Sequence, residues 1–263
     1  MLTKTLSDIC YKTVDGISLY LDILRPGFQH DELMPAVIYV HGGGWMSGSR
    51  KPNRRNKVLA QQGFFTVSID YRLSQQAQFP AQLEDVQDAV RWLRVHAAEY
   101  GIDPHRIGIW GHSSGGHLAA LLGTSAAMDP ELCVQAVVAI SSPTDLAQMV
   151  GEQDTPDTAA ALLLGGAIHS RSQLARQANP ISYVNESVPP FLLIHGTADD
   201  VVALSQSELL YQALLAVHAD VTLVPVPDEN HIFNVHAETG WSYIERLGLE
   251  FFQQHLMADV KLQ

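Results

Sequence analysis

The chain has 263 residues, of which 46% are hydrophobic and 17% charged, a composition typical of a globular protein with a substantial core. Its formal net charge of −12, from 28 acidic residues against 16 lysines and arginines, argues against nucleic acid and anionic membrane surfaces as partners. Because neither an apolar run of membrane-spanning length nor a secretory signal is visible, the sequence predicts a cytoplasmic protein with one domain over residues 1–263.

The first predicted elements are two strands, at residues 9–14 and 17–24, which flank the turn dipeptide Asp15-Gly16 and should form an antiparallel hairpin. Helical spacing of apolar residues is found over residues 80–100 and again over residues 241–251. Apolar strand candidates alternate with helical patterns, and this order predicts an α/β fold with an about eight-stranded, mostly parallel sheet flanked by helices. The six remaining strands are predicted at residues 36–40, 64–69, 106–110, 134–140, 191–194 and 221–226.

Residues 145–184 interrupt this alternation with a long connection between two predicted strands. Connections of that length are usually functional or carry helices of their own. Residues 159–164 have a helical pattern that Gly165-Gly166 should end, which favours a small helical lid inserted in the domain. An ordinary crossover helix with irregular ends is the alternative.

The two cysteines, Cys10 and Cys133, lie far apart and match no metal-ligand spacing, so we expect both to be buried free thiols. Neither a metal ion nor an organic cofactor is predicted.

The stretch I-G-I-W-G-H-S-S-G-G-H at residues 107–117 joins a predicted strand to a predicted helix over residues 114–124. A serine at the tip of such a turn exposes its hydroxyl only if the chain reverses abruptly, and small residues two positions away on either side permit this. Gly111 and Gly115 flank Ser113 in that way. Ser113 is therefore the predicted nucleophile, and an ordinary glycine-rich helix start is the alternative.

A hydroxyl that attacks a carbonyl creates an oxyanion, which needs preorganised hydrogen-bond donors. The segment H-G-G-G-W at residues 41–45 follows the strand predicted at residues 36–40, and its glycine N–H groups are unshielded. We expect this loop and the N–H of Ser114 to form the oxyanion hole. The side chains of His41 and Trp45, which flank the glycines, are predicted to contact the substrate.

Serine needs a base, and the base needs an orienting carboxylate. His231 follows the last predicted strand and is the predicted base among twelve histidines. His112 and His117 adjoin the predicted nucleophile and are expected to pack or to form hydrogen bonds. Asp199, on the loop after the strand at residues 191–194, is the predicted acid. Asp200 is expected to cap or begin the next helix. Asp145, which follows the preceding predicted strand, is the alternative acid.

Taken together, H-G-G-G-W, D-Y-R-L at residues 70–73, F-P-A at residues 79–81, G-H-S-S-G-G-H and H-G-T-A-D resemble the α/β-hydrolase esterases of the hormone-sensitive-lipase type. The sequence is most similar to their bifunctional feruloyl and acetyl xylan esterase branch. The resemblance implies that Gly43 and Gly44 donate to the oxyanion and that Ser113, Asp199 and His231 form the triad. Larger relatives have a helical cap before H-G-G-G, whereas strands are predicted here, so the acyl site is expected to be open, with residues 145–184 as its roof.

These features predict a serine carboxylic ester hydrolase that acts on short acyl or aryl esters through an acyl-enzyme, with a small-molecule ester as partner and a homo-oligomer as an open possibility. Kynurenine formamidases share H-G-G-x-W, so an amide hydrolase on the same triad is the alternative. A non-catalytic ligand-binding relative is a second alternative, which the complete set of predicted catalytic residues disfavours.

Overall fold

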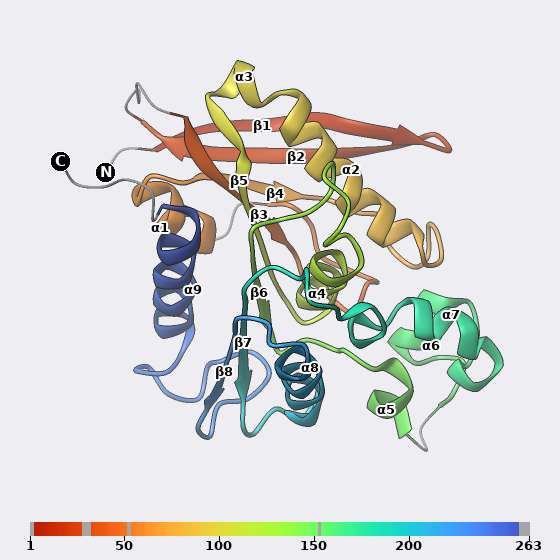
Figure 1. Cartoon of the computed structure of the whole chain (residues 1–263). Helices are drawn as coiled ribbons and strands as arrows, with labels where there is room; N and C mark the ends of the chain where they lie inside the picture. The colour runs from red at the N-terminus through yellow and green to blue at the C-terminus, as the bar shows by residue number, and fades with distance from the viewer. Residues whose placement is uncertain (1–2, 28–32, 52–53, 152–153, 258–263) are drawn as a thin grey trace.

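The computed structural model describes residues 3–27, 33–51, 54–151 and 154–257, and a single mixed sheet of eight strands runs through them (Figure 1). The strand order is β1-β2-β4-β3-β5-β6-β7-β8. β1 pairs antiparallel with β2, and β2 antiparallel with β4, whereas every later pair is parallel. All eight predicted strands are confirmed. Their bounds are β1 Thr3–Val14, β2 Ile17–Pro26, β3 Met34–Val40, β4 Phe65–Ile69, β5 Ile102–His112, β6 Ala136–Ile140, β7 Phe191–Gly196 and β8 Val221–Val226.

Helices cover both faces of the sheet, and each face has its own core. β3 is buried along its whole length: Ile38 and Val40 belong to one core, and Val37 and Tyr39 to the other. This alternation follows from the two-residue period of a strand. α1 and α9 lie on one side of the strands in Figure 1, and α2, α4 and α8 on the other. The bounds of these helices, with the short α3, are α1 Arg54–Gln61, α2 Ala81–Val95, α3 Ala97–Tyr100, α4 Ser114–Ser125, α8 Ser205–Ala216 and α9 Trp241–Leu256.

Residues 145–184 form a group of short helices beside the carboxyl end of β6 (Figure 1). They are α5 Leu146–Val150, α6 Ala159–Leu164, α7 Ser172–Gln177 and the 3₁₀ turns η2 Ile168–Arg171 and η3 Pro180–Tyr183. The helix expected at residues 159–164 is confirmed, and Gly165 ends it in a left-handed conformation with φ of 72°.

Two local expectations were wrong. Cys10 and Cys133 are free thiols, as expected, but neither is buried: Cys10 is exposed on the edge strand β1, and Cys133 is half-buried. Asp200 neither caps nor begins the next helix, since α8 starts at Ser205 after an N-cap at Leu204. The helical pattern expected at residues 80–100 is confirmed, and it is divided at His96 into α2 and α3.

Parallel strands place all their carboxyl ends at one edge of the sheet, where ligand sites of α/β proteins form. The loops after β3, β5, β7 and β8 therefore meet at the same edge. These four loops carry the oxyanion segment and the three residues of the predicted triad.

Among the described residues, no helix combines the length and the apolar character that a membrane crossing requires.

Candidate active site

Ser113 lies at the turn between β5 and α4 with φ of 58° and ψ of −124°, a conformation that non-glycine residues seldom adopt. The turn is tight enough that side chains on its glycines would collide with neighbouring backbone. A Cβ on Gly111 would lie 2.4 Å from the carbonyl carbon of Gly115, and one on Gly115 would lie 2.1 Å from the carbonyl oxygen of Val40. The backbone N–H of Ser113 donates to the carbonyl of Ile140 at 2.8 Å, which fixes the turn to β6.

The three residues of the predicted triad are in hydrogen-bond contact. His231 Nε2 lies 3.0 Å from Ser113 Oγ, and His231 Nδ1 lies 2.7 Å from Asp199 Oδ2. A carboxylate only accepts, so Nδ1 carries the proton and Nε2 presents its lone pair to the serine hydroxyl. This is the tautomer that a general base requires.

The carboxylate of Asp199 is held in place by hydrogen bonds from other groups besides His231. Its side chain is fully buried, and its Oδ1 accepts from the backbone N–H groups of Val201 at 3.0 Å and Val202 at 2.9 Å. His195 Nε2 lies 3.2 Å from Oδ2 while also donating to the carbonyl of Val202 at 2.8 Å. Burial acts to raise the pKa of Asp199, but the hydrogen bonds from His195, His231 and Val202 outweigh it and hold the pKa below its ordinary value.

The loop that carries His231 has two further attachments. The buried carboxylate of Glu229 accepts from the N–H groups of Val235 and His236 and from the hydroxyl of Thr239. His112 Nε2 donates to the carbonyl of His231 at 2.7 Å. Burial and the neighbouring His231 lower the pKa of His112 to about 3, so the His112 ring stays neutral. His236 also lies in this loop, before the start of α9 at Trp241.

The predicted oxyanion loop, residues 41–45 (hereafter the oxyanion loop), lies against the Ser113 turn. A Cβ on Gly42 would meet Ser113 Cβ at 3.4 Å, and Gly43 and Gly44 have φ of 121° and 61°. The Gly43 carbonyl accepts from the N–H groups of Met46 and Ser47, whereas the N–H groups of Gly43 and Gly44 have no acceptor among the described residues. Ser114 is the first residue of α4, so its N–H also has no intrahelical partner.

The side chains of His41 and Trp45 were expected to contact the substrate, but both are enclosed by protein. Trp45 is 2% exposed, and its indole Nε1 donates to His117 Nδ1 at 3.2 Å. The His41 ring is 5% exposed and stacks on Tyr71 with 4.3 Å between ring centroids. Each side chain supports the loop from within the protein.

The alternative acid, Asp145, is used elsewhere. Its Oδ1 accepts from the N–H groups of Ala147 and Gln148 and so caps α5, and Asn179 Nδ2 donates to the same oxygen at 3.2 Å. Among the described residues, no hydrogen bond or ion pair joins Asp145 to His231. Within the described part of the chain, no group of three or more His, Cys, Asp or Glu side chains is arranged to hold a metal ion.

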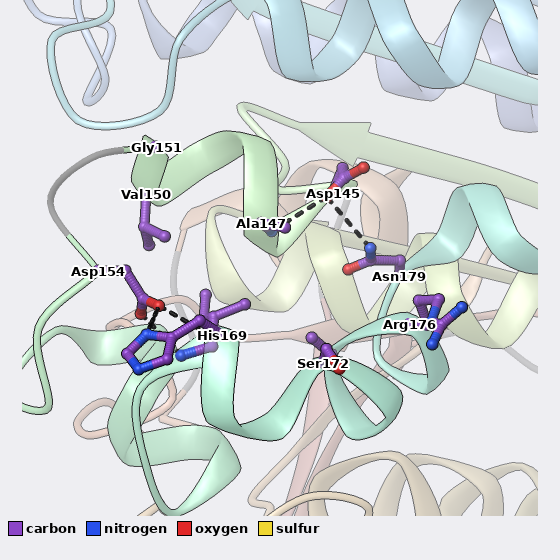
Figure 2. A pocket seen from close by; sticks show the side chains of 11 residues that line it. Asp145, Ala147, Val150, Gly151, Asp154, His169, Ser172, Arg176 and Asn179 are labelled. Atoms are coloured by element: carbon purple, nitrogen blue, oxygen red, sulfur yellow. Dashed lines mark hydrogen bonds and ion pairs between the residues drawn. The ribbon is translucent and has the colours of Figure 1, made fainter.

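A cleft of about 440 Å³ is lined by residues from 145–151 and 154–179, and Figure 2 shows their side chains. Val150 and Gly151 line it from α5 and its end, and Ser172 and Arg176 line it from α7. Asp154 and His169 form an ion pair at one end of the cleft, with 2.6 Å between Oδ2 and Nδ1. Ser113, Asp199 and His231 are not among the residues that line it.

The BD-FAE family model matches residues 21–214, which is most of the chain. The chain belongs to the BD-FAE family. Its α/β-hydrolase fold and its similarity to hormone-sensitive-lipase-type esterases, both expected from the sequence, are thereby confirmed.

Relatives of this BD-FAE chain include two esterases of Mycobacterium tuberculosis. Esterase LipQ is 34% identical over 88% of this chain and 58% of its own length, and Esterase LipC is 32% identical over 84% of this chain and 58% of its own length. The chain therefore spans less than two thirds of these relatives.

Solved structures extend the comparison over nearly the whole fold. A truncated form of a carbohydrate esterase from gut microbiota superposes with a TM-score of 0.86, at 29% identity over 97% of this chain and 96% of the other. Esterase 2 of Thermogutta terrifontis with butyrate bound gives a TM-score of 0.79, at 25% identity over 95% and 94% of the two chains. The same esterase phosphonylated by sarin gives a TM-score of 0.81, at 26% identity over 95% and 94% of the two chains.

Proposed function

We propose that this protein is a serine carboxylic ester hydrolase. The observation that carries the proposal is the continuous hydrogen-bonded line from Ser113 Oγ through His231 to Asp199 Oδ2, with distances of 3.0 and 2.7 Å. Serine is a weak nucleophile at neutral pH, and a correctly oriented imidazole is what activates it. The similarity to enzymes named as esterases supports the same conclusion.

In the proposed reaction, His231 Nε2 takes the hydroxyl proton as Ser113 Oγ bonds to the ester carbonyl carbon. The N–H groups of Gly43, Gly44 and Ser114 donate to the resulting oxyanion, and Asp199 stabilises the imidazolium. The C–O bond to the alcohol then breaks, and the alcohol leaves with the proton from His231. Water, deprotonated by His231, attacks the acyl-enzyme, releases the acid and restores the Ser113 hydroxyl.

The proposed substrates are esters of short acyl groups. A Cβ on Gly44 would lie 3.5 Å from Ala159 Cβ, so α6 closely adjoins the oxyanion loop. Phe79 N–H donates to the carbonyl of Leu163 at 2.9 Å, which fixes the far end of α6 as well. We infer that residues 145–184 form the roof of the acyl site. The butyrate-bound structure of esterase 2 supports short acyl groups, and the carbohydrate esterase supports an acylated sugar as substrate.

The amide-hydrolase alternative rested on Trp45. Because the indole is buried against His117, its presence gives no preference for a formamide substrate.

The test is hydrolysis of p-nitrophenyl esters from acetate to decanoate by the wild type and by Ser113→Ala. Removing the nucleophile should lower kcat by roughly 10⁴-fold or more with folding intact, and turnover should be greatest for the short chains. Ser125→Ala is the matched control, because Ser125 lies at the far end of the same helix and donates to the carbonyl of Leu121. Full activity in a folded Ser113→Ala protein would exclude the proposed mechanism.

A further inference from the structure

His117 lies one turn after Ser113 on α4, and its ring is completely buried. Both ring nitrogens are hydrogen-bonded: Nδ1 lies 3.2 Å from Trp45 Nε1, and Nε2 lies 2.7 Å from the carbonyl oxygen of Ala178. An indole N–H can only donate and a carbonyl can only accept. The surroundings therefore fix one neutral tautomer, with the proton on Nε2.

The Trp45 end of this contact belongs to the oxyanion loop. Trp45 has φ of 59°, which is an outlier for so bulky a residue and persists only where surrounding contacts hold it. Three groups do so: the N–H and the hydroxyl of Ser74 donate to the Trp45 carbonyl at 2.8 and 3.2 Å, and His117 accepts from the indole. Gly44, whose N–H is a proposed oxyanion donor, directly precedes this constrained residue.

The Ala178 end belongs to residues 145–184. Ala178 follows α7, and the side chain of its neighbour Asn179 accepts from the N–H of Leu146 at the start of α5. His117 thus connects the short helices to the oxyanion loop through the interior. The second connection is the direct approach of Ala159 to Gly44.

We propose that His117 is a positioning residue that holds the oxyanion loop in its donating conformation and couples that loop to residues 145–184. The inference rests on the proposed esterase function, which it deepens. Burial lowers the pKa of His117 to about 4, so the connection stays intact at neutral pH.

Three variants separate this role from simple packing. Trp45→Phe keeps an aromatic side chain, although a smaller one, and removes the N–H donor. His117→Leu removes both hydrogen bonds, and His117→Gln can retain them with its amide oxygen as acceptor and its amide nitrogen as donor. His96→Leu is the matched control: His96 stacks on Trp92 with 4.2 Å between ring centroids, at the junction of α2 and α3, away from the triad.

Trp45→Phe and His117→Leu should each lower kcat about 10- to 100-fold and change KM by less than about 3-fold, because displaced oxyanion donors act in the transition state. Inhibition by a trifluoromethyl ketone, whose adduct with serine carries an oxyanion, should weaken by a similar factor. The double variant should be no worse than the poorer single one, since both remove the same contact. His117→Gln should recover most of the activity, and His96→Leu should match the wild type.

Amide hydrogen exchange over residues 41–47 supplies a measurement that does not depend on turnover. We expect faster exchange there in Trp45→Phe and His117→Leu and no change in His96→Leu. Suppose that Trp45→Phe and His117→Leu both have the kcat and the amide exchange rates of the wild type, and that the wild type hydrolyses esters. That result would overturn this inference and leave the esterase proposal intact. Absence of ester turnover in the wild type would overturn the esterase proposal, and the exchange rates alone would then decide whether His117 holds the loop.

Discussion

The carboxylate of Asp199 is the most constrained group of the candidate site. Two backbone N–H groups occupy Oδ1, and two histidines approach Oδ2 at 2.7 and 3.2 Å. Because these donors lower its pKa, Asp199 is ionised at neutral pH. Its charge is therefore available to stabilise the imidazolium of His231 in the proposed reaction.

Asp199→Asn should lower kcat/KM by roughly 10³- to 10⁴-fold, because an amide at this position favours the wrong tautomer of His231. Two nearby carboxylates provide matched controls. Asp200 is exposed, and Asp145 caps α5, where asparagine caps equally well. Asp200→Asn and Asp145→Asn should retain activity within about 3-fold of the wild type. A larger loss in Asp145→Asn than in Asp199→Asn, measured on p-nitrophenyl acetate, would reassign the acid.

The roles of single residues could be predicted from the sequence only where a local pattern of residues indicates them. Ser113, Asp199 and His231 each follow a strand in the order that this fold uses, so their contacts matched expectation. Two other contacts depend on how separate loops meet, and no local sequence pattern predicts such contacts. They are the contact of His195 with Asp199 and that of His112 with the His231 carbonyl. The expected contact of Trp45 with substrate differs from the structure for the same reason, because its burial against His117 also depends on how separate elements meet.

At the level of elements, the turn from β5 into α4 depends on two close contacts between backbone segments that only glycine permits. Gly111 approaches the backbone of Gly115, and Gly115 approaches that of Val40. Gly115 faces the carbonyl of Val40 on β3, so the first turn of α4 rests directly on the neighbouring strand. This contact brings the N–H of Ser114 beside the oxyanion loop, which begins where β3 ends.

Gly115→Ala should lower the free energy of unfolding by about 1–3 kcal/mol, because its Cβ would overlap the Val40 carbonyl oxygen. It should also reduce kcat through displacement of Ser114. Gly248→Ala is the matched control: it lies inside α9, and its Cβ would meet Trp110 at an ordinary 3.4 Å. Urea denaturation that shows equal stability for the two variants would contradict the proposed close packing.

Element boundaries were less predictable than the elements themselves. β5 was expected at residues 106–110 but extends over Ile102–His112, and Met34 of β3 pairs with Ile102. Residues 103–105 read as Asp-Pro-His, a polar stretch typical of a loop. The register between β3 and β5 shifts here: among the described pairs, none joins residues 103–105 to β3, and Ile102 resumes the pairing beyond them. That distant pairing is visible only once the neighbouring strand is in place.

Across the whole molecule, buried neutral histidines make stability depend on pH. The pKa values of His112 and His117 are lowered to about 3 and about 4, whereas histidine in an unfolded chain titrates near 6.5. Between about pH 6.5 and 4 the unfolded state therefore binds more protons than the folded state. The free energy of unfolding should fall as the pH falls through this range.

Replacing His117 should remove its share of that dependence. Each such histidine contributes a slope of up to about 1.4 kcal/mol per pH unit, so the loss of stability on acidification should be shallower in His117→Gln. Urea denaturation at several pH values between about 7 and 4.5 measures the slope. His96→Gln, at a half-buried site, is the control. An unchanged slope in His117→Gln would mean that the ring is protonated in the folded protein.

The distances along the chain between the triad residues have a consequence for synthesis. Ser113 and His231 are 118 residues apart, and Asp199 precedes His231 by 32. During translation, Ser113 therefore leaves the ribosome long before His231 has been synthesised. β7 and β8 must then dock at the far edge of the sheet before Ser113 and His231 can come into contact. If Ser113 and His231 act as proposed, an unfinished or misfolded chain carries an inert serine, and reactivity toward an acylating reagent reports that the carboxyl-terminal half has folded.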